Sequence, residues 1–97
     1  MSVNSMKLSL IVPCYNEAEN VAAFQQAVIA AFDGCGYDYE IVYIDDGSRD
    51  ATLHNLKKLH ASKECPVQVI SFSRNFGKEA GIYAGLEHAR GNYISLI

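Results

Sequence analysis

The sequence lacks several features that would place it in other protein classes. Its three cysteines, Cys14, Cys35 and Cys65, are odd in number and have no metal-ligand spacing, so they predict neither a zinc site nor a disulfide framework. We interpret them as free thiols in a reducing compartment, which predicts a cytoplasmic location. No apolar run approaches the length of a membrane span. Residues 1–7 contain no signal-like apolar stretch.

The sequence also has few basic residues, and it lacks two common nucleotide-binding motifs. It has 8 Lys and Arg against 11 Asp and Glu, a net charge of −3, and its basic residues form no patch. We therefore exclude a nucleic-acid partner held by charge. The Gly34-x-Gly36 pair precedes a predicted strand instead of following one, and no P-loop is present, so neither phosphate-binding fingerprint applies. With 97 residues the chain holds one domain at most.

What the sequence does contain is a regular alternation of apolar runs and helical periodicities. The runs predict strands over residues 8–13, 39–44, 67–72 and 93–97. Apolar residues at helical spacing predict three helices between these strands. The first helix is expected to begin with a capping box from Asn16 to Glu19 and to end at Gly34 and Gly36. Ser48 or Asp50 is expected to cap the second helix. The third is expected over about 78–90, with Gly91 as its C-terminal cap.

This order predicts an α/β fold with a mostly parallel, Rossmann-like sheet. The small residues Ala80, Gly81, Ala84 and Gly85 predict a third helix that packs close to the sheet. The last predicted strand has no loop after it, so we expect a truncated domain. We also expect its open apolar edge to favour self-association.

Three polar segments follow the predicted strands: residues 13–17, 45–50 and 73–78. In parallel sheets, ligands bind beyond the carboxyl ends of the strands, which makes these segments candidates for a binding site. The first offers a tyrosine face that can stack on a base, and the third has a glycine and two cations suited to a diphosphate. Each also has a purely structural interpretation, as a capped helix start or a solvated loop.

The adjacent carboxylates Asp45 and Asp46 favour a functional interpretation more strongly. Two like charges at a strand end repel each other unless a ligand N–H, a hydroxyl or a cation uses them. An Asx turn followed by a helix cap would explain Ser48 and Asp50, but it explains two neighbouring aspartates poorly.

Taken together, the three segments resemble one protein family. They read Val-Pro-Cys-Tyr-Asn-Glu, Ile-Asp-Asp-Gly-Ser-Arg-Asp and Ser-Arg-Asn-Phe-Gly-Lys, and their order and spacing are similar to those of inverting GT-A glycosyltransferases of the glycosyl transferase family 2 type. The polyprenyl-phosphate glycosyltransferases, related to dolichyl-phosphate mannose synthase, resemble the chain most. The resemblance covers residues 8–97, and it implies that residues 1–97 form one partial GT-A domain, its nucleotide-binding half.

The resemblance also implies a set of nucleotide-binding residues. The set is Pro13, Tyr15, Glu17, Ile44, Asp45, Asp46, Arg74 and Lys78. Pro13, Tyr15 and Glu17 would frame the base and ribose, and Ile44 would line the base pocket. Asp46 would bond to the base, with Asp45 beside it. Lys78, together with Arg74, would face the diphosphate. The segment 89–94 resembles the lead-in to the family's metal-binding Asp-x-Asp, which is expected after Ile97 together with the catalytic base.

The implied reaction is transfer of a sugar from a nucleotide-diphosphate sugar, with a UDP-sugar favoured, to a polyprenyl phosphate. The complete enzyme would use Mg²⁺ or Mn²⁺ and work at the cytoplasmic face of a membrane, while the 97 residues alone would bind nucleotide without transferring sugar. Three alternatives remain open: a receiver-type regulatory module, a sugar-phosphate nucleotidyltransferase, and a folded or oligomerising piece that has lost activity. The first has its acidic pair after another strand, and the second needs a glycine-rich basic loop that is absent here.

Overall fold

The computed structural model describes residues 7–97, in which strands and helices alternate along the chain. The strands are β1 (Lys7–Cys14), β2 (Asp38–Asp45), β3 (Val67–Ser71) and β4 (Tyr93–Leu96). The helices are α1 (Val21–Phe32), α2 (Thr52–Ser62) and α3 (Lys78–His88). Residues 1–6 lie outside the described residues. The prediction that residues 1–7 contain no signal-like apolar stretch falls mostly on them.

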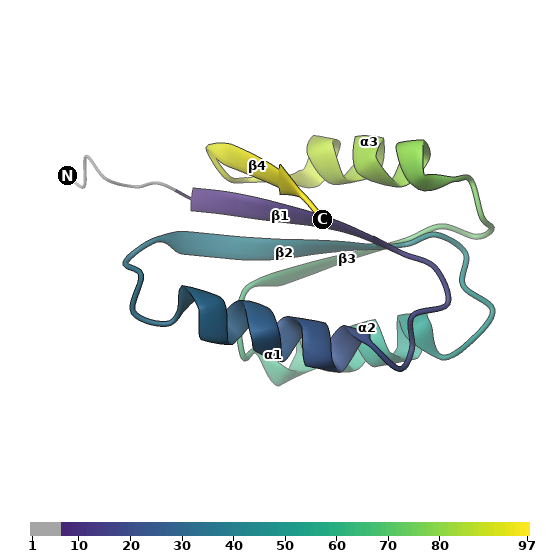
Figure 1. Ribbon diagram of the computed structural model, residues 1–97. Coiled ribbons are helices and arrows are strands. Elements are labelled where there is room, and N and C mark those ends of the chain that lie inside the picture. The colour runs from purple at the N-terminus through teal and green to yellow at the C-terminus, as the bar shows by residue number, and fades with distance from the viewer. Residues whose placement is uncertain (1–6) are drawn as a thin grey trace.

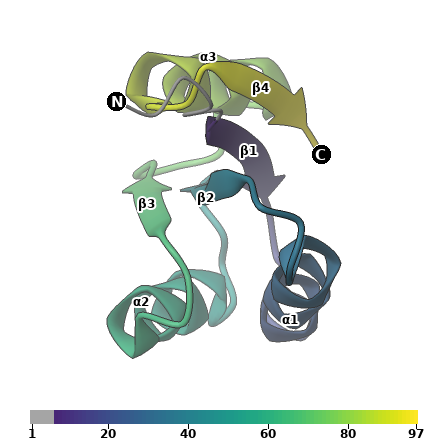
Figure 2. The ribbon, with the colours of Figure 1, turned by 90° about the vertical axis from the view of Figure 1, so that its left-hand side faces the viewer.

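The four strands form one parallel sheet in the order β3-β2-β1-β4. Helices α1 and α2 cover one face and α3 covers the other, as Figures 1 and 2 show. This arrangement confirms the predicted α/β, Rossmann-like sheet. It also excludes the receiver-type alternative, because β1 lies between β2 and β4 here, whereas a flavodoxin-like receiver places β3 next to β1.

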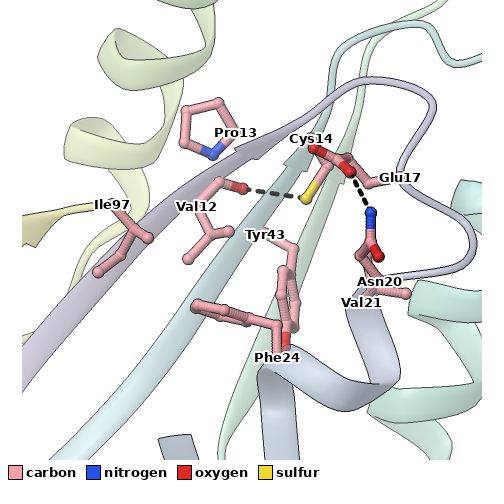
Figure 3. Close-up of a pocket in the computed structure, with 9 residues that line it drawn as sticks. All are labelled: Val12, Pro13, Cys14, Glu17, Asn20, Val21, Phe24, Tyr43 and Ile97. Atoms are coloured by element: carbon pink, nitrogen blue, oxygen red, sulfur yellow. Dashed lines mark hydrogen bonds between the residues drawn. The ribbon is translucent and has the colours of Figure 1, made fainter. Parts of the chain in front are cut away.

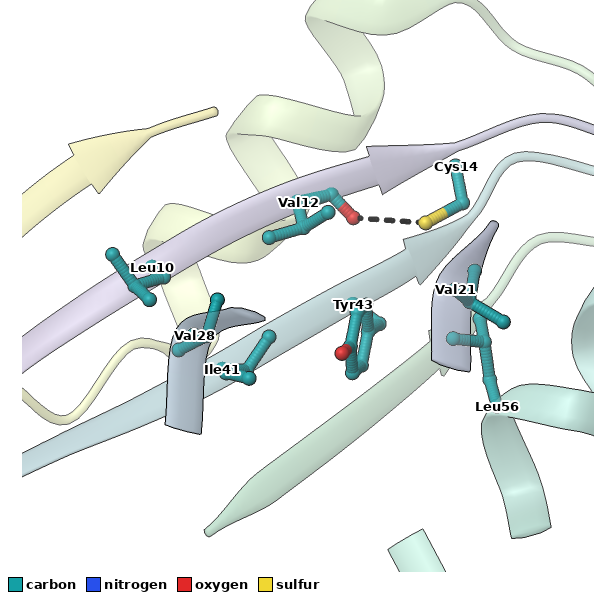
Figure 4. Close-up of a cluster of buried hydrophobic side chains, with 8 residues drawn as sticks. All are labelled: Leu10, Val12, Cys14, Val21, Val28, Ile41, Tyr43 and Leu56. Carbon is teal, nitrogen blue, oxygen red and sulfur yellow. Dashed lines mark hydrogen bonds between the residues drawn. The ribbon is translucent and has the colours of Figure 1, made fainter. Parts of the chain in front are cut away.

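The larger part of the core lies between the sheet and helices α1 and α2 (Figure 4). Its buried residues are Leu10, Val12, Cys14, Val21, Val28, Ile41, Tyr43 and Leu56. Alternate residues of β1 and β2 supply this face, since successive side chains of a strand point to opposite sides of the sheet. The hydroxyl of Tyr43 donates to Gln25 Oε1 over 3.0 Å, so this buried hydroxyl is satisfied, whereas the buried Nε2 of Gln25 has no partner among residues 7–97.

Helix α3 packs closely on the opposite face through its small residues. Gly81 and Gly85 are buried, and a Cβ added to Gly85 would lie 2.5 Å from Ile11 Cγ2. A Cβ on Gly81 would lie 3.5 Å from its nearest neighbour, Pro13 Cβ, an ordinary contact. The predicted packing role is therefore confirmed for Gly81 and Gly85, and it is strictest at Gly85, whereas Ala80 and Ala84 are only partly buried.

Three predicted helix boundaries are wrong. Helix α2 begins at Thr52 after Ala51, so neither Ser48 nor Asp50 is its N-cap residue. Helix α1 begins at Val21, not in a capping box at Asn16, because Asn16 has a φ of 54° and its side chain accepts the N–H of Arg49 instead. Helix α3 ends at His88, and Gly91 is not its cap. Gly91 is needed for a close approach, since a Cβ there would lie 2.6 Å from the carbonyl oxygen of Lys7.

A buried carboxylate fixes the α3–β4 turn at the amino end of the sheet. Glu40 is 3% exposed, and its oxygens accept the hydroxyl of Ser9 (2.6 Å), the amide of Gln68 (2.9 Å) and the N–H of Arg90 (2.7 Å). Burial raises the pKa of Glu40, but these hydrogen bonds outweigh burial and the net pKa is lowered. The sequence analysis missed this network, which lies at the end of the sheet opposite the polar segments.

Candidate functional site

The polar segments meet where β1, β2 and β3 end, at the right-hand side of Figure 1. Here the strand order changes direction, with β1 paired to β2 on one side and to β4 on the other. Such a switch point is where open α/β sheets bind ligands. A cavity of about 310 Å³ lies there, lined by Pro13, Cys14, Tyr15, Glu17, Asp46, Lys78 and Ile97.

The cavity brings together five of the residues expected to bind nucleotide. These are Pro13, Tyr15, Glu17, Asp46 and Lys78. Tyr15 is 44% exposed, so part of this side chain is accessible to a ligand. Lys78 is exposed at the first residue of α3, where its charge adds to the positive end of the helix dipole. A tyrosine face, two carboxylates and a cation therefore share one concave surface.

Three other predicted site residues lie outside this lining. Ile44 is fully buried in the core beneath α3 with Ile11 and Val42. Asp45 is 2% exposed, and its Oδ1 accepts the N–H of Ser48 over 3.3 Å. The guanidinium of Arg74 lies over the ring of Phe76, 4.3 Å from the ring centroid, in a cation–π contact. Their roles toward a nucleotide stay predictions.

Asp46 has a structural task that the sequence did not predict. Its Oδ1 accepts the N–H of Phe76 over 2.8 Å and its Oδ2 accepts the N–H of Gly77 over 3.1 Å. A carboxylate from the end of β2 thus caps the start of α3 and fixes the position of Lys78. Because Asp45 and Asp46 each have backbone donors of their own, their adjacency does not require a ligand or a cation.

Gly47 makes this arrangement possible. Its φ is 69°, and a Cβ there would lie 2.2 Å from the backbone carbon of Arg74 and 2.3 Å from the nitrogen of Asn75. Only glycine suits both the left-handed conformation and the close approach. The turn after β2 therefore packs directly on the loop before α3, and the second and third polar segments form one unit.

A second cavity of about 340 Å³ adjoins the first on the α1 side, and its lining includes Phe24, Tyr43 and Asn20 (Figure 3). The rings of Phe24 and Tyr43 meet edge to face with centroids 6.3 Å apart. Sequence reasoning missed these residues, although the helical spacing of Phe24 could have indicated that it faces the sheet.

Cys14 lies in the wall that both cavities share, and it is a free thiol, as predicted for all three cysteines. Burial raises the pKa of Cys14 to about 12, and the charges of Glu17 and Asp45 add to this shift. The group is consequently a neutral thiol at physiological pH and no nucleophile.

Residues 7–97 do not by themselves offer a site for a metal ion. Within that range no three His, Cys, Asp or Glu side chains are grouped as ligands. The same part of the chain contains no helix with the length and apolar character that crossing a membrane requires.

Comparison with known proteins places this geometry in a family. The family model described as glycosyl transferase family 2 matches residues 9–97. The chain is 45% identical over 89 residues to the prophage bactoprenol glucosyl transferase homolog of Escherichia coli, covering 92% of this chain and 29% of that protein. It is 38% identical over 93 residues to the dodecaprenyl-phosphate galacturonate synthase of Rhizobium johnstonii, covering 96% of this chain and 28% of that protein. The chain thus spans less than a third of the length of these relatives.

A solved structure supports the fold independently. The mannosyltransferase PcManGT from Pyrobaculum calidifontis, in complex with GDP-Man and Mn²⁺, superposes with a TM-score of 0.72 at 22% identity, over 90% of this chain and 25% of that one. At this identity the likeness establishes the fold, which is of the GT-A, Rossmann-like type that the resemblance implied. With the family model matching nearly the whole sequence, the chain belongs to glycosyl transferase family 2.

Proposed function

We propose that this chain is the nucleotide-recognition part of an enzyme that transfers a sugar from a nucleotide-diphosphate sugar to a polyprenyl phosphate. The observation that carries the proposal is the cavity at the switch point, where Tyr15, Glu17 and Lys78 face one space. Membership of glycosyl transferase family 2 supports a nucleotide-diphosphate sugar as the donor. The names of two relatives, one a bactoprenol glucosyl transferase homolog and one a dodecaprenyl-phosphate galacturonate synthase, support a lipid-phosphate acceptor.

In this proposal each group of the cavity has a defined partner on the nucleotide. Tyr15 stacks on the base, as aromatic rings do with unpaired bases. Glu17 accepts a hydrogen bond from the ribose, and Asp46, which keeps free lone pairs after accepting two N–H groups, accepts one from the base. Lys78 and the N-terminus of α3 attract the diphosphate.

The transfer inverts the anomeric carbon. An oxygen of the acceptor phosphate attacks that carbon, a new C–O bond forms, and the bond to the diphosphate oxygen breaks with its electron pair leaving on the nucleoside diphosphate. Because the acceptor phosphate is already an anion, it needs little help from a general base. We propose that the complete enzyme uses Mg²⁺ or Mn²⁺ and acts at the cytoplasmic face of a membrane, and that the 97-residue partial GT-A domain alone transfers no sugar.

Titration calorimetry with UDP, a UDP-sugar and GDP tests the proposal on the chain as it stands. We expect weak, saturable binding with a Kd of about a millimolar or below, tightest for the uridine nucleotides. Tyr15→Ala should weaken binding roughly tenfold, since base stacking contributes about 1–3 kcal/mol. Tyr83→Ala, which removes another exposed tyrosine from the outside of α3, should leave binding unchanged. Absence of heat with every nucleotide, or equal losses in the two variants, would overturn the assignment.

A further inference from the structure

The loop that carries Tyr15 and Glu17 is held by side chains from another part of the chain. Three successive backbone N–H groups of this loop each donate to a side-chain oxygen of the segment between β2 and the start of α2. The pairs are Asn16 to Ser48 Oγ at 2.9 Å, Glu17 to Thr52 Oγ1 at 2.9 Å, and Ala18 to Asp50 Oδ2 at 3.2 Å. We refer to Ser48, Asp50 and Thr52 as the clasp.

Thr52 and Asp50 act together within the clasp. The hydroxyl of Thr52, which is fully buried, accepts the N–H of Glu17 and donates to Asp50 Oδ1. Asp50 Oδ1 also accepts the N–H of Thr52 over 2.9 Å. Donor, hydroxyl and carboxylate thus form a chain in which each hydrogen bond polarises the next. Since both oxygens of Asp50 accept, an amide in its place would set an NH₂ group against one of these donors.

Contacts in the reverse direction complete the attachment. Asn16 Oδ1 accepts the N–H of Arg49 over 2.9 Å, and Asn55 Nδ2 donates to the carbonyl of Ala18 over 2.9 Å. Asn16 has a φ of 54°, a left-handed conformation that asparagine tolerates better than most residues. The backbone on both sides of Glu17 is therefore fixed without any ligand present.

We propose that Ser48, Asp50 and Thr52 are positioning residues for nucleotide recognition. None of the three lines either cavity described above, so they act through the loop that presents Tyr15 and Glu17. A loop that is already in its binding conformation loses less conformational freedom when the ligand arrives, which raises affinity. This inference rests on the proposed nucleotide site, and it assigns to the Ser-x-Asp-x-Thr pattern a task other than the predicted capping of helix α2.

Two substitutions at one position separate positioning from simple stability. Thr52→Val keeps the shape of the side chain and removes the acceptor of the Glu17 N–H, whereas Thr52→Ser keeps the hydroxyl. We expect Thr52→Val to weaken UDP binding by about tenfold. Thr52→Ser should bind UDP with an affinity within about twofold of that of the unmodified chain. Leu56→Val, in the core-facing side of the same helix, lowers stability without touching the clasp and should bind UDP normally.

A second measurement needs no nucleotide. Amide hydrogen exchange, read by NMR on the ligand-free chain, should be slow at Glu17 and Ala18 and should accelerate at Glu17 in Thr52→Val and at Ala18 in Asp50→Asn. If the unmodified chain binds no nucleotide, the proposed function fails. If it binds, but Thr52→Val binds as tightly as Thr52→Ser or leaves exchange at Glu17 unchanged, the positioning proposal alone is overturned.

Discussion

At the residue scale, Lys78 is the cation that the structure places beside the carboxylates of the cavity. We expect Lys78→Gln to weaken binding of UDP by about tenfold, because a hydrogen bond from a charged donor contributes about 1.5–3 kcal/mol. Uridine, which has no phosphate, should bind both proteins equally. Calorimetry with the two ligands at low and high salt checks this, since the loss should shrink as salt screens the charge. Lys58→Gln, on the exposed surface of α2, is the control, and a similar loss there would contradict the assignment.

Asp46 combines a predicted ligand contact with an observed structural one. Asp46→Ala removes the acceptor of the Phe76 and Gly77 N–H groups, so it should lower the free energy of unfolding by about 1–2 kcal/mol as well as weaken UDP binding. Urea unfolding followed by circular dichroism measures the first effect. Asp38→Ala, an exposed aspartate at the start of β2, should change neither quantity. Full stability in Asp46→Ala would show that the cap is unimportant.

At the scale of elements, the contact of α3 with the sheet predicts that the same substitution, glycine to alanine, changes stability in opposite directions at two positions of this helix. Gly81→Ala should leave stability unchanged or raise it by up to about 1 kcal/mol, since alanine favours helix and its Cβ has room. Gly85→Ala should lower the free energy of unfolding by about 1–3 kcal/mol, because its Cβ would overlap the fully buried Ile11. Thermal and urea unfolding of the two variants test this prediction. An equal change in the free energy of unfolding of both variants would mean that α3 can shift on the sheet.

The Glu40 network predicts how stability depends on pH. The pKa of Glu40 is lower in the folded than in the unfolded chain, so its contribution is fully present above the unfolded pKa and is lost as pH falls through the folded pKa. The stability difference between the unmodified chain and Glu40→Gln should therefore be largest near pH 7 and shrink in acid. Urea titrations from pH 7 to about pH 3 measure it. Glu79→Gln, exposed on α3, should show no such pH-dependent difference.

At the scale of the whole molecule, we propose self-association through β4, which pairs with β1 on one side only in residues 7–97. Tyr93, Leu96 and Ile97 are each more than half exposed. An apolar strand with unpaired backbone groups is a template for a second copy. Light scattering over a dilution series should give a mass that rises with concentration, and Leu96→Lys should lower it. A monomer at every concentration would contradict the proposal.

The sequence predicted the parts of this molecule that depend on local pattern. The order of elements followed from apolar runs and helical spacing, and the family's motifs placed Tyr15, Glu17 and Lys78 near one another. It did not predict the contacts that depend on distant partners. The capping of α3 by Asp46 and the burial of Glu40 join residues about 30 to 50 positions apart, and neither pairing leaves a periodic signal. Asn16 was misplaced for the same reason, since its partner, Arg49, lies on another loop.

The strand order also has a consequence for synthesis of the chain. β1 pairs with β2 through Leu8 and Tyr39, but with β4 through Leu8 and Tyr93, so its two neighbours emerge from the ribosome at different times. At a rate of about 5–20 residues per second, the nascent chain carries a central strand with one unsatisfied edge for roughly 3–10 s. During that interval the open edge of β1 is exposed to pairing with a neighbouring nascent chain on the same message.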